Sequence, residues 1–150
     1  MINIPSTILT YSAEQTEKFG AELANTLISN TDLPHFIALY GDLGVGKTAF
    51  VRGFTSVIAP EKRVKSPTFA LVHEYTAGGV SVFHFDMYRI ADEDELYSIG
   101  FYDYWGRNGY IITEWSENIP YALPDRYLSI NIEKVSVDSP DERRITIKLL

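Results

Sequence analysis

The spacing of apolar residues predicts an amphipathic helix in the first fifth of the chain. Phe19, Leu23 and Leu27 follow one another at four-residue intervals, which places them on one face of a helix. Ser12 precedes them in the pattern of a capping box, in which a serine hydroxyl accepts a hydrogen bond from the first helical turn. We therefore expect a helix that begins after Ser12 and ends near Asn30.

Two further helices are predicted later in the chain. The first covers residues 49–58, starting at Ala49, where apolar residues recur at helical spacing. The second is short and covers residues 92–99, because a run of acidic residues opens it and a glycine follows it. The aromatic stretch 101–105 suggests another helical turn or a lid. Since residues 97–105 hold many rings, they are a candidate partner surface, with ordinary core packing as the alternative.

Short apolar runs bounded by turn residues predict the strands of a sheet. They cover residues 36–40, 69–75, 80–86, 110–114, 128–132 and 145–149. The connection at residues 76–79 permits only an antiparallel hairpin, and a second hairpin is expected around a turn at residues 138–141. Together with the segment GDLGVGKT at residues 41–48, which has the pattern of a phosphate-binding loop, these elements predict an α/β fold, a single-domain P-loop NTPase-like sandwich over residues 1–150 with a mixed sheet and antiparallel hairpins.

The composition excludes several classes of protein. The chain of 150 residues contains no cysteine, so it has neither disulfides nor thiolate metal sites. No apolar run approaches the roughly 20 residues that cross a membrane, and residues 1–5 lack the features of a signal peptide. We therefore expect a cytoplasmic protein with no membrane partner. The net charge of −7 argues against a broad nucleic-acid-binding surface, and the basic residues at 61–65 fit a solvated helix end.

Residues 41–48 read GDLGVGKT and match the phosphate-binding pattern GxxxxGK[ST] at every fixed position. An apolar strand precedes this loop and a helix follows it, so backbone N–H groups and the positive end of the helix can face an anion. Lys47 is expected to reach the terminal phosphates, and the Thr48 hydroxyl is expected to contact Mg²⁺. The predicted nucleotide-binding residues are Asp42, Leu43, Gly44, Val45, Gly46, Lys47 and Thr48.

Two acidic residues at strand ends are candidates for the rest of the chemistry. Glu114 ends the apolar run 110–113, and Asp86 ends the run 82–85. One acid is needed to hold Mg²⁺ and the other to orient the attacking water, because Mg²⁺ takes only one or two protein oxygens beside its waters. The residues alone leave the two roles interchangeable. The predicted catalytic set is therefore Asp86, Glu114 and Lys47.

Other residues near this set have a less specific pattern. Ser66 and Thr68 lie on either side of Pro67, in a segment that fits either a switch loop sensing the terminal phosphate or an ordinary turn. His84 lies two residues before Asp86 on the same face of a strand, and we interpret it mainly as a structural residue. No G-x-S-x-G elbow is present, so the sequence gives no support for hydrolysis by a nucleophilic serine. No Asn-Lys-x-Asp or Thr-Lys-x-Asp string is present either, which favours adenine over guanine.

These motifs together resemble one family, the bacterial TsaE proteins, which are small P-loop ATPases needed for making threonylcarbamoyladenosine in tRNA. The likeness rests on GDLGVGKT at 41–48, SPTF at 66–69, HFDMYR at 84–89 and EW at 114–115, in the order found in that family. It extends from about residue 11 to residue 132. Val45 stands where alanine is more usual, at a free position of the loop.

The resemblance implies how the site is assembled. It implies phosphate binding by residues 42–48, and contact of Mg²⁺ with Thr48 and Glu114. It implies a catalytic or switch role for Asp86 and for residues 66–68. It also implies that Trp115 lies beside the nucleotide, and that Thr10 and Tyr11 of the amino-terminal segment lie near adenine.

The resemblance also implies a biological role, with ATP and Mg²⁺ as cofactors. Such proteins associate with TsaB and TsaD, and TsaD transfers threonylcarbamoyl to adenosine 37 of tRNA. The resemblance implies that ATP hydrolysis, slow in the isolated protein, resets that pair between rounds. It also implies that the protein interacts with tRNA only indirectly, through the complex.

Two alternatives share the same loop. A small-molecule kinase would need an acceptor pocket and a lid, for which Arg89 and Arg107 are candidates, although surface or ion-pairing roles explain both more simply. A nucleotide-gated binding module would bind ATP without needing to hydrolyse it.

Overall fold

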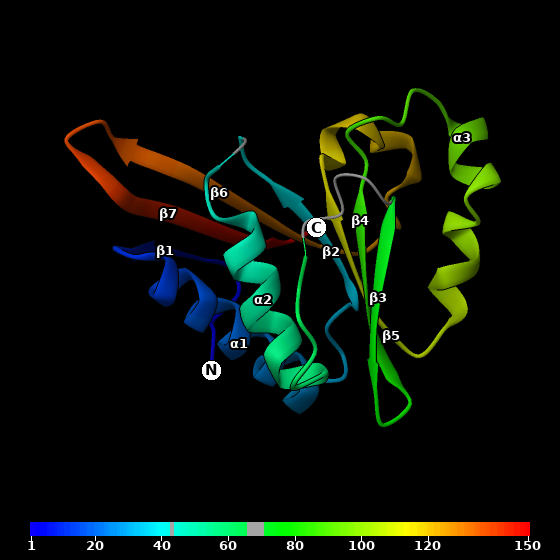
Figure 1. Ribbon diagram of the computed structural model, residues 1–150, viewed down its shortest axis with the longest axis horizontal. Coiled ribbons are helices and arrows are strands. Elements are labelled where there is room, and N and C mark those ends of the chain that lie inside the picture. The colour runs from blue at the N-terminus through cyan, green and yellow to red at the C-terminus, as the bar shows by residue number, and fades with distance from the viewer. Residues whose placement is uncertain (43, 66–70) are drawn as a thin grey trace.

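A seven-stranded mixed sheet runs through the protein in the order β1-β7-β6-β2-β5-β4-β3 (Figure 1). The computed structural model describes residues 1–42, 44–65 and 71–150. Strands β4, β5, β2 and β6 are parallel, and β3, β7 and β1 pair in antiparallel fashion, which confirms the predicted α/β class and mixed sheet. The strands are β1 (Ser6–Thr10), β2 (Phe36–Tyr40), β3 (Val72–Ala77), β4 (Val80–Asp86), β5 (Gly109–Glu114), β6 (Leu128–Ser136) and β7 (Ser139–Leu149).

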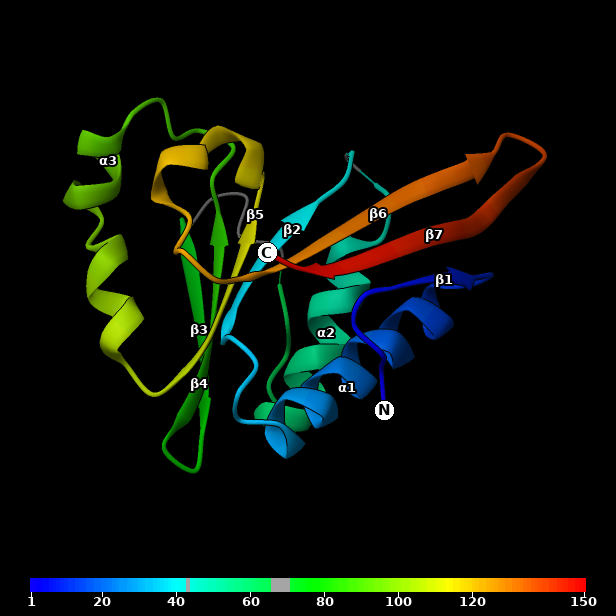
Figure 2. The same cartoon turned by 180° about the vertical axis from the view of Figure 1, so that it is seen from behind.

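Helices cover both faces of this sheet (Figures 1 and 2). Helices α1 (Ala13–Ser29) and α2 (Lys47–Ile58) pack on one face, and α3 (Glu93–Ser98) lies on the other with the 3₁₀ helix η1 (Phe101–Gly106). Two short 3₁₀ turns follow β5, namely η2 (Ser116–Asn118) and η3 (Pro120–Ala122). None of the helices in the described ranges has the length and apolarity needed to cross a bilayer.

The first helix has the predicted bounds. The Ser12 hydroxyl accepts a hydrogen bond from the backbone N–H of Gln15 at 3.2 Å, and Asn30 caps the other end.

Helices α1 and α2 approach each other closely at two glycines. A Cβ atom at Gly53 would lie 1.7 Å from the carbonyl oxygen of Glu17, and one at Gly20 would be almost as close to the backbone of α2. These glycines let α2 lie flat against α1, and α2 begins at the phosphate-binding loop.

Both predicted hairpins are present, but their turns lie elsewhere than expected. In the first, Gly78 and Gly79 alone form the turn with φ of 59° and 81°, so residues 76–77 belong to β3. In the second, β7 already begins at Ser139, so the turn lies about two residues before the predicted 138–141. Pro140 lies in the part of β7 before Arg143, which β1 does not reach. Because no neighbouring strand among the described residues is paired there on the β1 side, the missing N–H of Pro140 costs no hydrogen bond to β1.

Strand β1 was not predicted from the sequence. This strand has five residues and lies at an edge of the sheet, where β7 is its one neighbour among the described strands. The aromatic stretch after α3 forms the helical turn η1. Its Phe101 is fully buried, whereas Tyr97 before it is 64% exposed, so the stretch is partly core and partly surface.

Candidate active site

The glycine-rich loop connects the carboxyl end of β2 to the first turn of α2. Gly41, Gly44 and Gly46 have φ of 145°, 79° and 112°, values that other residues rarely adopt. A side chain at Gly41 would also meet the carbonyl oxygen of Ile132 at 2.5 Å. The glycines are therefore required by the path of the backbone, and this path allows N–H groups to face a common point.

Strands from opposite ends of the chain brace this loop. The Nε atom of Arg143, on β7, donates a hydrogen bond to the carbonyl oxygen of Val45 at 2.8 Å. Arg143 is paired across the sheet with Thr10 of β1, whose hydroxyl lies 2.8 Å from that of Thr16. Thr16 in turn borders Gly46, because its methyl group would lie 3.7 Å from a Cβ atom there. Thr10 therefore lies beside the loop, and Tyr11 follows it in sequence.

Lys47 is buried at the start of α2, with only 6% of its surface exposed. Its ammonium group donates a hydrogen bond to the carbonyl oxygen of Gly41 at 2.6 Å. The same Nζ atom lies 4.0 Å from Oε1 of Glu114 and 4.7 Å from the centre of the Trp115 ring. A carbonyl, a carboxylate and an aromatic face therefore surround the cation at the opening of the loop.

The two predicted acids lie side by side. Strands β4 and β5 are parallel neighbours, and Asp86 is in register with Glu114 at their carboxyl ends. Glu114 is buried, whereas Asp86 is partly exposed and accepts a hydrogen bond from the backbone N–H of Tyr88 at 2.9 Å. Because β5 neighbours β2, the strand that leads into the loop, both acids reach the same edge of the sheet as Lys47.

His84 contacts the buried acid directly. Its Nε2 atom lies 2.5 Å from Oε2 of Glu114, and its side chain is completely buried. Its second ring nitrogen, Nδ1, is also buried and has no hydrogen-bond partner among the residues that the structure describes. The sequence offers only a weak sign of this contact, namely that His84 and Asp86 share a face of β4.

Trp115 adopts a backbone conformation that is unusual for an aromatic residue. Its φ of 56° lies in the left-handed region. The ring contacts that of Tyr88 with 4.9 Å between centroids, in addition to its contact with the Lys47 ammonium. Strain of this kind persists where the surrounding structure enforces it, and it is common at functional sites.

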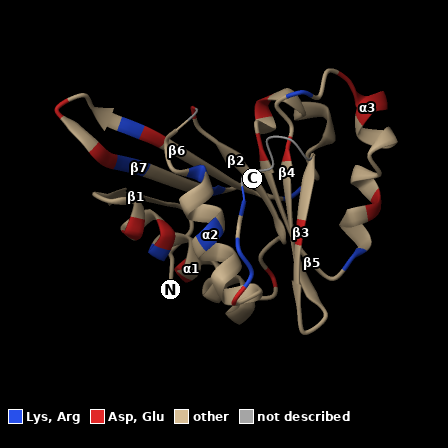
Figure 3. Ribbon diagram, in the orientation of Figure 1, with Lys and Arg blue, Asp and Glu red and all other residues tan. Residues whose placement is uncertain are grey.

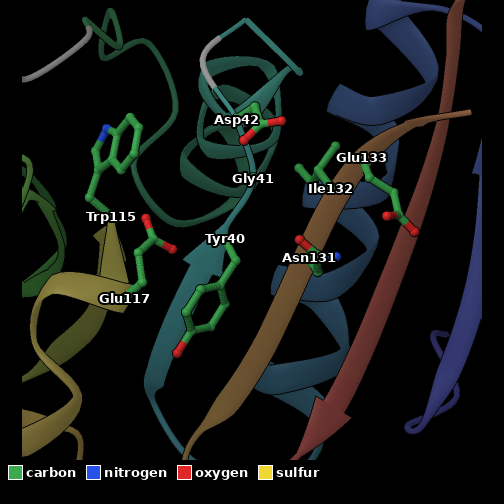
Figure 4. A pocket seen from close by; sticks show the side chains of 8 residues that line it. All are labelled: Tyr40, Gly41, Asp42, Trp115, Glu117, Asn131, Ile132 and Glu133. Carbon is green, nitrogen blue, oxygen red and sulfur yellow. The ribbon is translucent and has the colours of Figure 1, made fainter.

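A cavity of about 450 Å³ lies beside the loop (Figure 4). Trp115 and Glu117 approach it from one side, and residues of β6 from the other. Burial raises the pKa of Tyr40, at its base, to about 12, with smaller contributions from Tyr127 and from the charge of Glu117. The residues that line it are Tyr40, Gly41, Asp42, Trp115, Glu117, Asn131, Ile132 and Glu133.

The oxygen atoms around the loop fit a Mg²⁺ ion held mainly by nucleotide phosphates. Within the described ranges, no three His, Cys, Asp or Glu side chains gather into a metal site. Magnesium in phosphate sites needs less, because it keeps several waters and takes one or two carboxylates from the protein. Thr48 in the first turn of α2 and Glu114 at the end of β5 are of the required type, and Glu114 has one oxygen, Oε1, that is not bonded to His84.

Some predicted residues fall elsewhere. Leu43 and the segment 66–70, which includes Ser66 and Thr68, lie outside the residues that the structure describes. Arg107 forms an ion pair with Glu74 and stacks on Phe83, just before the amino end of β5 and away from the loop. Arg107 therefore lies near the amino-terminal ends of the parallel strands, whereas Lys47 lies near their carboxyl-terminal ends.

The environment of Asp86 leads to a prediction about stability. Partial burial raises the pKa of Asp86, and the Glu114 carboxylate adds to this, against the lowering effect of the Tyr88 N–H. A carboxyl group with a higher pKa in the folded than in the unfolded state costs stability above that pKa, and the cost vanishes as the pH falls to the unfolded value of about 4.

We therefore expect Asp86→Asn to be more stable than the wild type at neutral pH, by a margin that shrinks towards pH 4. Asparagine keeps an oxygen for the Tyr88 N–H, so this hydrogen bond is preserved. Urea unfolding at several pH values measures the difference. An exposed control, Asp138→Asn, accounts for the loss of one negative charge from the whole chain. A variant that is less stable than the wild type at neutral pH would contradict the assignment.

Comparisons with known proteins give consistent results. The family model described as "Threonylcarbamoyl adenosine biosynthesis protein TsaE" matches residues 10–145. A Haemophilus influenzae protein named tRNA threonylcarbamoyladenosine biosynthesis protein TsaE is 39% identical over 117 residues, which are 77% of this chain and 74% of that one. A Bacillus subtilis protein of the same name is 38% identical over 110 residues, covering 73% and 66%. The crystal structure of Bacillus subtilis YdiB superposes with a TM-score of 0.67 at 26% identity, covering 97% of this chain and 87% of that one.

Proposed function

This chain belongs to the TsaE family, and we propose from this premise that it binds ATP with Mg²⁺ and hydrolyses the ATP in support of threonylcarbamoyladenosine synthesis on tRNA. The single observation that carries the proposal is the convergence of Lys47, Glu114 and Asp86 on the glycine-rich loop. A cation for phosphate, a buried acid for a metal and a second acid for water are what phosphoryl transfer to water requires. Residues 1–150 are proposed to act as one ATPase domain.

Each group has a proposed task in this reaction. The backbone N–H groups of the loop bind the phosphate oxygens, and Lys47 exchanges the carbonyl of Gly41 for an oxygen of the terminal phosphate. Thr48 and Glu114 hold Mg²⁺, which when bound neutralises charge that develops on the phosphates. Asp86 orients the attacking water by accepting its hydrogen bond. The raised pKa of Asp86 makes its carboxylate a better acceptor for a proton from that water.

The proposed partners are TsaB and TsaD, with ATP turnover resetting their complex between rounds of transfer to adenosine 37. The charge distribution supports a division of labour in which another subunit holds the tRNA. Lys and Arg are dispersed over α2, the segment after it and the β6–β7 hairpin, and Asp and Glu lie among them (Figure 3). The net charge is −7. Because tRNA is the target of the modification, we propose that the protein acts in the cytoplasm.

The two alternatives differ in what the site must contain. A small-molecule kinase needs a lid that closes over the phosphates, but Arg107, one of its two candidates, is bound to Glu74 at the other edge of the sheet. A nucleotide-gated binding module needs no acid to orient water, whereas here two carboxylates reach the opening of the loop. Hydrolysis is therefore the better proposal.

Reconstituted tRNA modification tests this function. We expect TsaB and TsaD with a threonylcarbamoyl donor to modify about one equivalent of tRNA without this chain, and many equivalents when the chain and ATP are added. The matched control replaces ATP with a non-hydrolysable analogue, which is expected to return the yield to the single-turnover level. Equal yields with and without the chain would contradict the proposed role, and full yield with the analogue would favour the binding module.

A further inference from the structure

We propose that His84 is a positioning residue that fixes the carboxylate of Glu114, an inference that rests on the function proposed above. The two residues belong to neighbouring parallel strands, β4 and β5. His84 is in register with Ile112, so Glu114 lies two residues further along the same face. Nε2 of His84 and Oε2 of Glu114 thereby lie within hydrogen-bonding distance of each other.

The surroundings determine which ring nitrogen carries the proton. Nδ1 of His84 is buried and has no hydrogen-bond partner among the described residues. With its proton on Nδ1, the ring would turn the lone pair of Nε2 towards the carboxylate of Glu114, which can only accept hydrogen bonds. A proton on Nε2 avoids this repulsion and forms the hydrogen bond. His84 is therefore the Nε2–H tautomer, and it donates to Glu114.

This hydrogen bond decides where the carboxylate of Glu114 points. Oε1 lies 4.0 Å from the ammonium of Lys47, a distance at which the acid and the cation are drawn together. His84 holds the other oxygen, Oε2, so Glu114 cannot turn both oxygens towards Lys47. Oε1 is thereby kept at the opening of the loop, available for a metal ion, and Lys47 is kept available for phosphate.

Packing alone does not explain a histidine at this position. The side chain lies among apolar residues of the sheet face that α2 covers, where an apolar side chain of similar size would fill the same space without a buried ring nitrogen. The neighbouring His73 of β3, which is in register with His84, is only partly buried, and its Nδ1 lies 3.2 Å from the hydroxyl of Tyr75. A buried polar atom without a partner calls for an explanation, and the contact of Nε2 with Glu114 supplies one here.

Imidazole nitrogen spectra of the protein without nucleotide test the hydrogen bond itself. The chain has three histidines, so their signals can be assigned by single substitutions. At neutral pH we expect His84 to carry its proton on Nε2, with a strongly downfield proton signal that moves upfield in Glu114→Gln. A proton on Nδ1, or a signal that is unchanged in Glu114→Gln, would overturn the proposal. This measurement stands even if the protein proves not to hydrolyse ATP, so the two failures are distinguishable.

Variants at position 84 test the positioning role. Removing a residue that orients a metal ligand typically costs about 10- to 100-fold in metal affinity or activity. We expect His84→Leu to raise the Mg²⁺ concentration for half-maximal hydrolysis and to lower kcat by such a factor. The dissociation constant for ATP measured in EDTA should be unchanged. His84→Gln, whose amide can donate to Glu114, is expected to recover part of both losses.

The matched control is His73→Leu, on the same face of the sheet, which should leave the Mg²⁺ dependence unchanged. If His84→Leu does not fold, His84→Gln and the spectra decide the question. His84→Gln must then keep a Mg²⁺ dependence within a few-fold of the wild type. Wild-type Mg²⁺ dependence in His84→Leu would leave only a structural role for His84 and would overturn the proposal.

Discussion

Lys47→Ala is expected to weaken ATP binding about 100-fold and to abolish support of tRNA modification. A hydrogen bond from a charged donor to phosphate contributes about 1.5–3 kcal/mol, and a tenfold change in affinity corresponds to about 1.4 kcal/mol. The variant also removes the cation that lies 4.0 Å from Glu114 and 4.7 Å from the Trp115 ring. Calorimetric titration with ATP in the presence of Mg²⁺ measures the loss.

Two controls make this result specific. Lys62→Ala removes an exposed lysine just beyond the end of α2, and it should bind ATP like the wild type. Unfolding of Lys47→Ala in urea should remain cooperative, because its side chain contributes to the loop and not to either apolar cluster of the core. Wild-type affinity in Lys47→Ala would show that the loop binds its ligand without this ammonium, and would contradict the proposed site.

Glu114→Gln is expected to lower hydrolysis by at least about 100-fold at saturating ATP, a loss typical for removal of one group that stabilises the transition state. Glutamine has nearly the same shape, so it keeps the packing of a side chain that is only 8% exposed while it removes the charge that would hold Mg²⁺. ATP binding measured in EDTA should change little. Steady-state hydrolysis over a range of Mg²⁺ concentrations separates the two effects.

The matched control for this variant is Glu117→Gln. Glu117 lines the cavity beside the loop but is exposed and lies beyond the end of β5. The Glu117→Gln variant should hydrolyse ATP at a rate within a few-fold of that of the wild type. If the Mg²⁺ dependence shifts in Asp86→Asn and not in Glu114→Gln, while both variants hydrolyse ATP slowly, the roles proposed for the two acids are reversed. If both hydrolyse normally, the nucleotide-gated module becomes the better description.

The sequence predicts those elements whose signals are local. The glycine loop, its flanking strand and helix, and the hairpins each depend on residues close together in the chain, and all are present. The Ser12 cap is an example, since the serine and its hydrogen-bond partner are three residues apart. Asp86 and Glu114 could also be selected from sequence, because each ends an apolar run and parallel neighbours end at the same edge.

Features that depend on contacts between distant residues could not be predicted. The contact between His84 and Glu114 joins residues 30 positions apart, and the bond from Arg143 to the carbonyl of Val45 spans 98 positions. The positive φ of Trp115 has no sign in the sequence, because an aromatic residue rarely adopts it. Strand β1 was missed for a related reason, since β7, the strand with which it pairs, comes last in the chain.

The pairing of the first strand with the last has a consequence for synthesis on the ribosome. Until β7 has left the exit tunnel, β1 has no strand to join, and the carbonyl of Val45 lacks the guanidinium of Arg143. A nascent chain that ends before Arg143 therefore carries the whole GDLGVGKT segment without its brace. We therefore expect a nascent chain of this kind to bind ATP more weakly than one that has already released Arg143 from the tunnel.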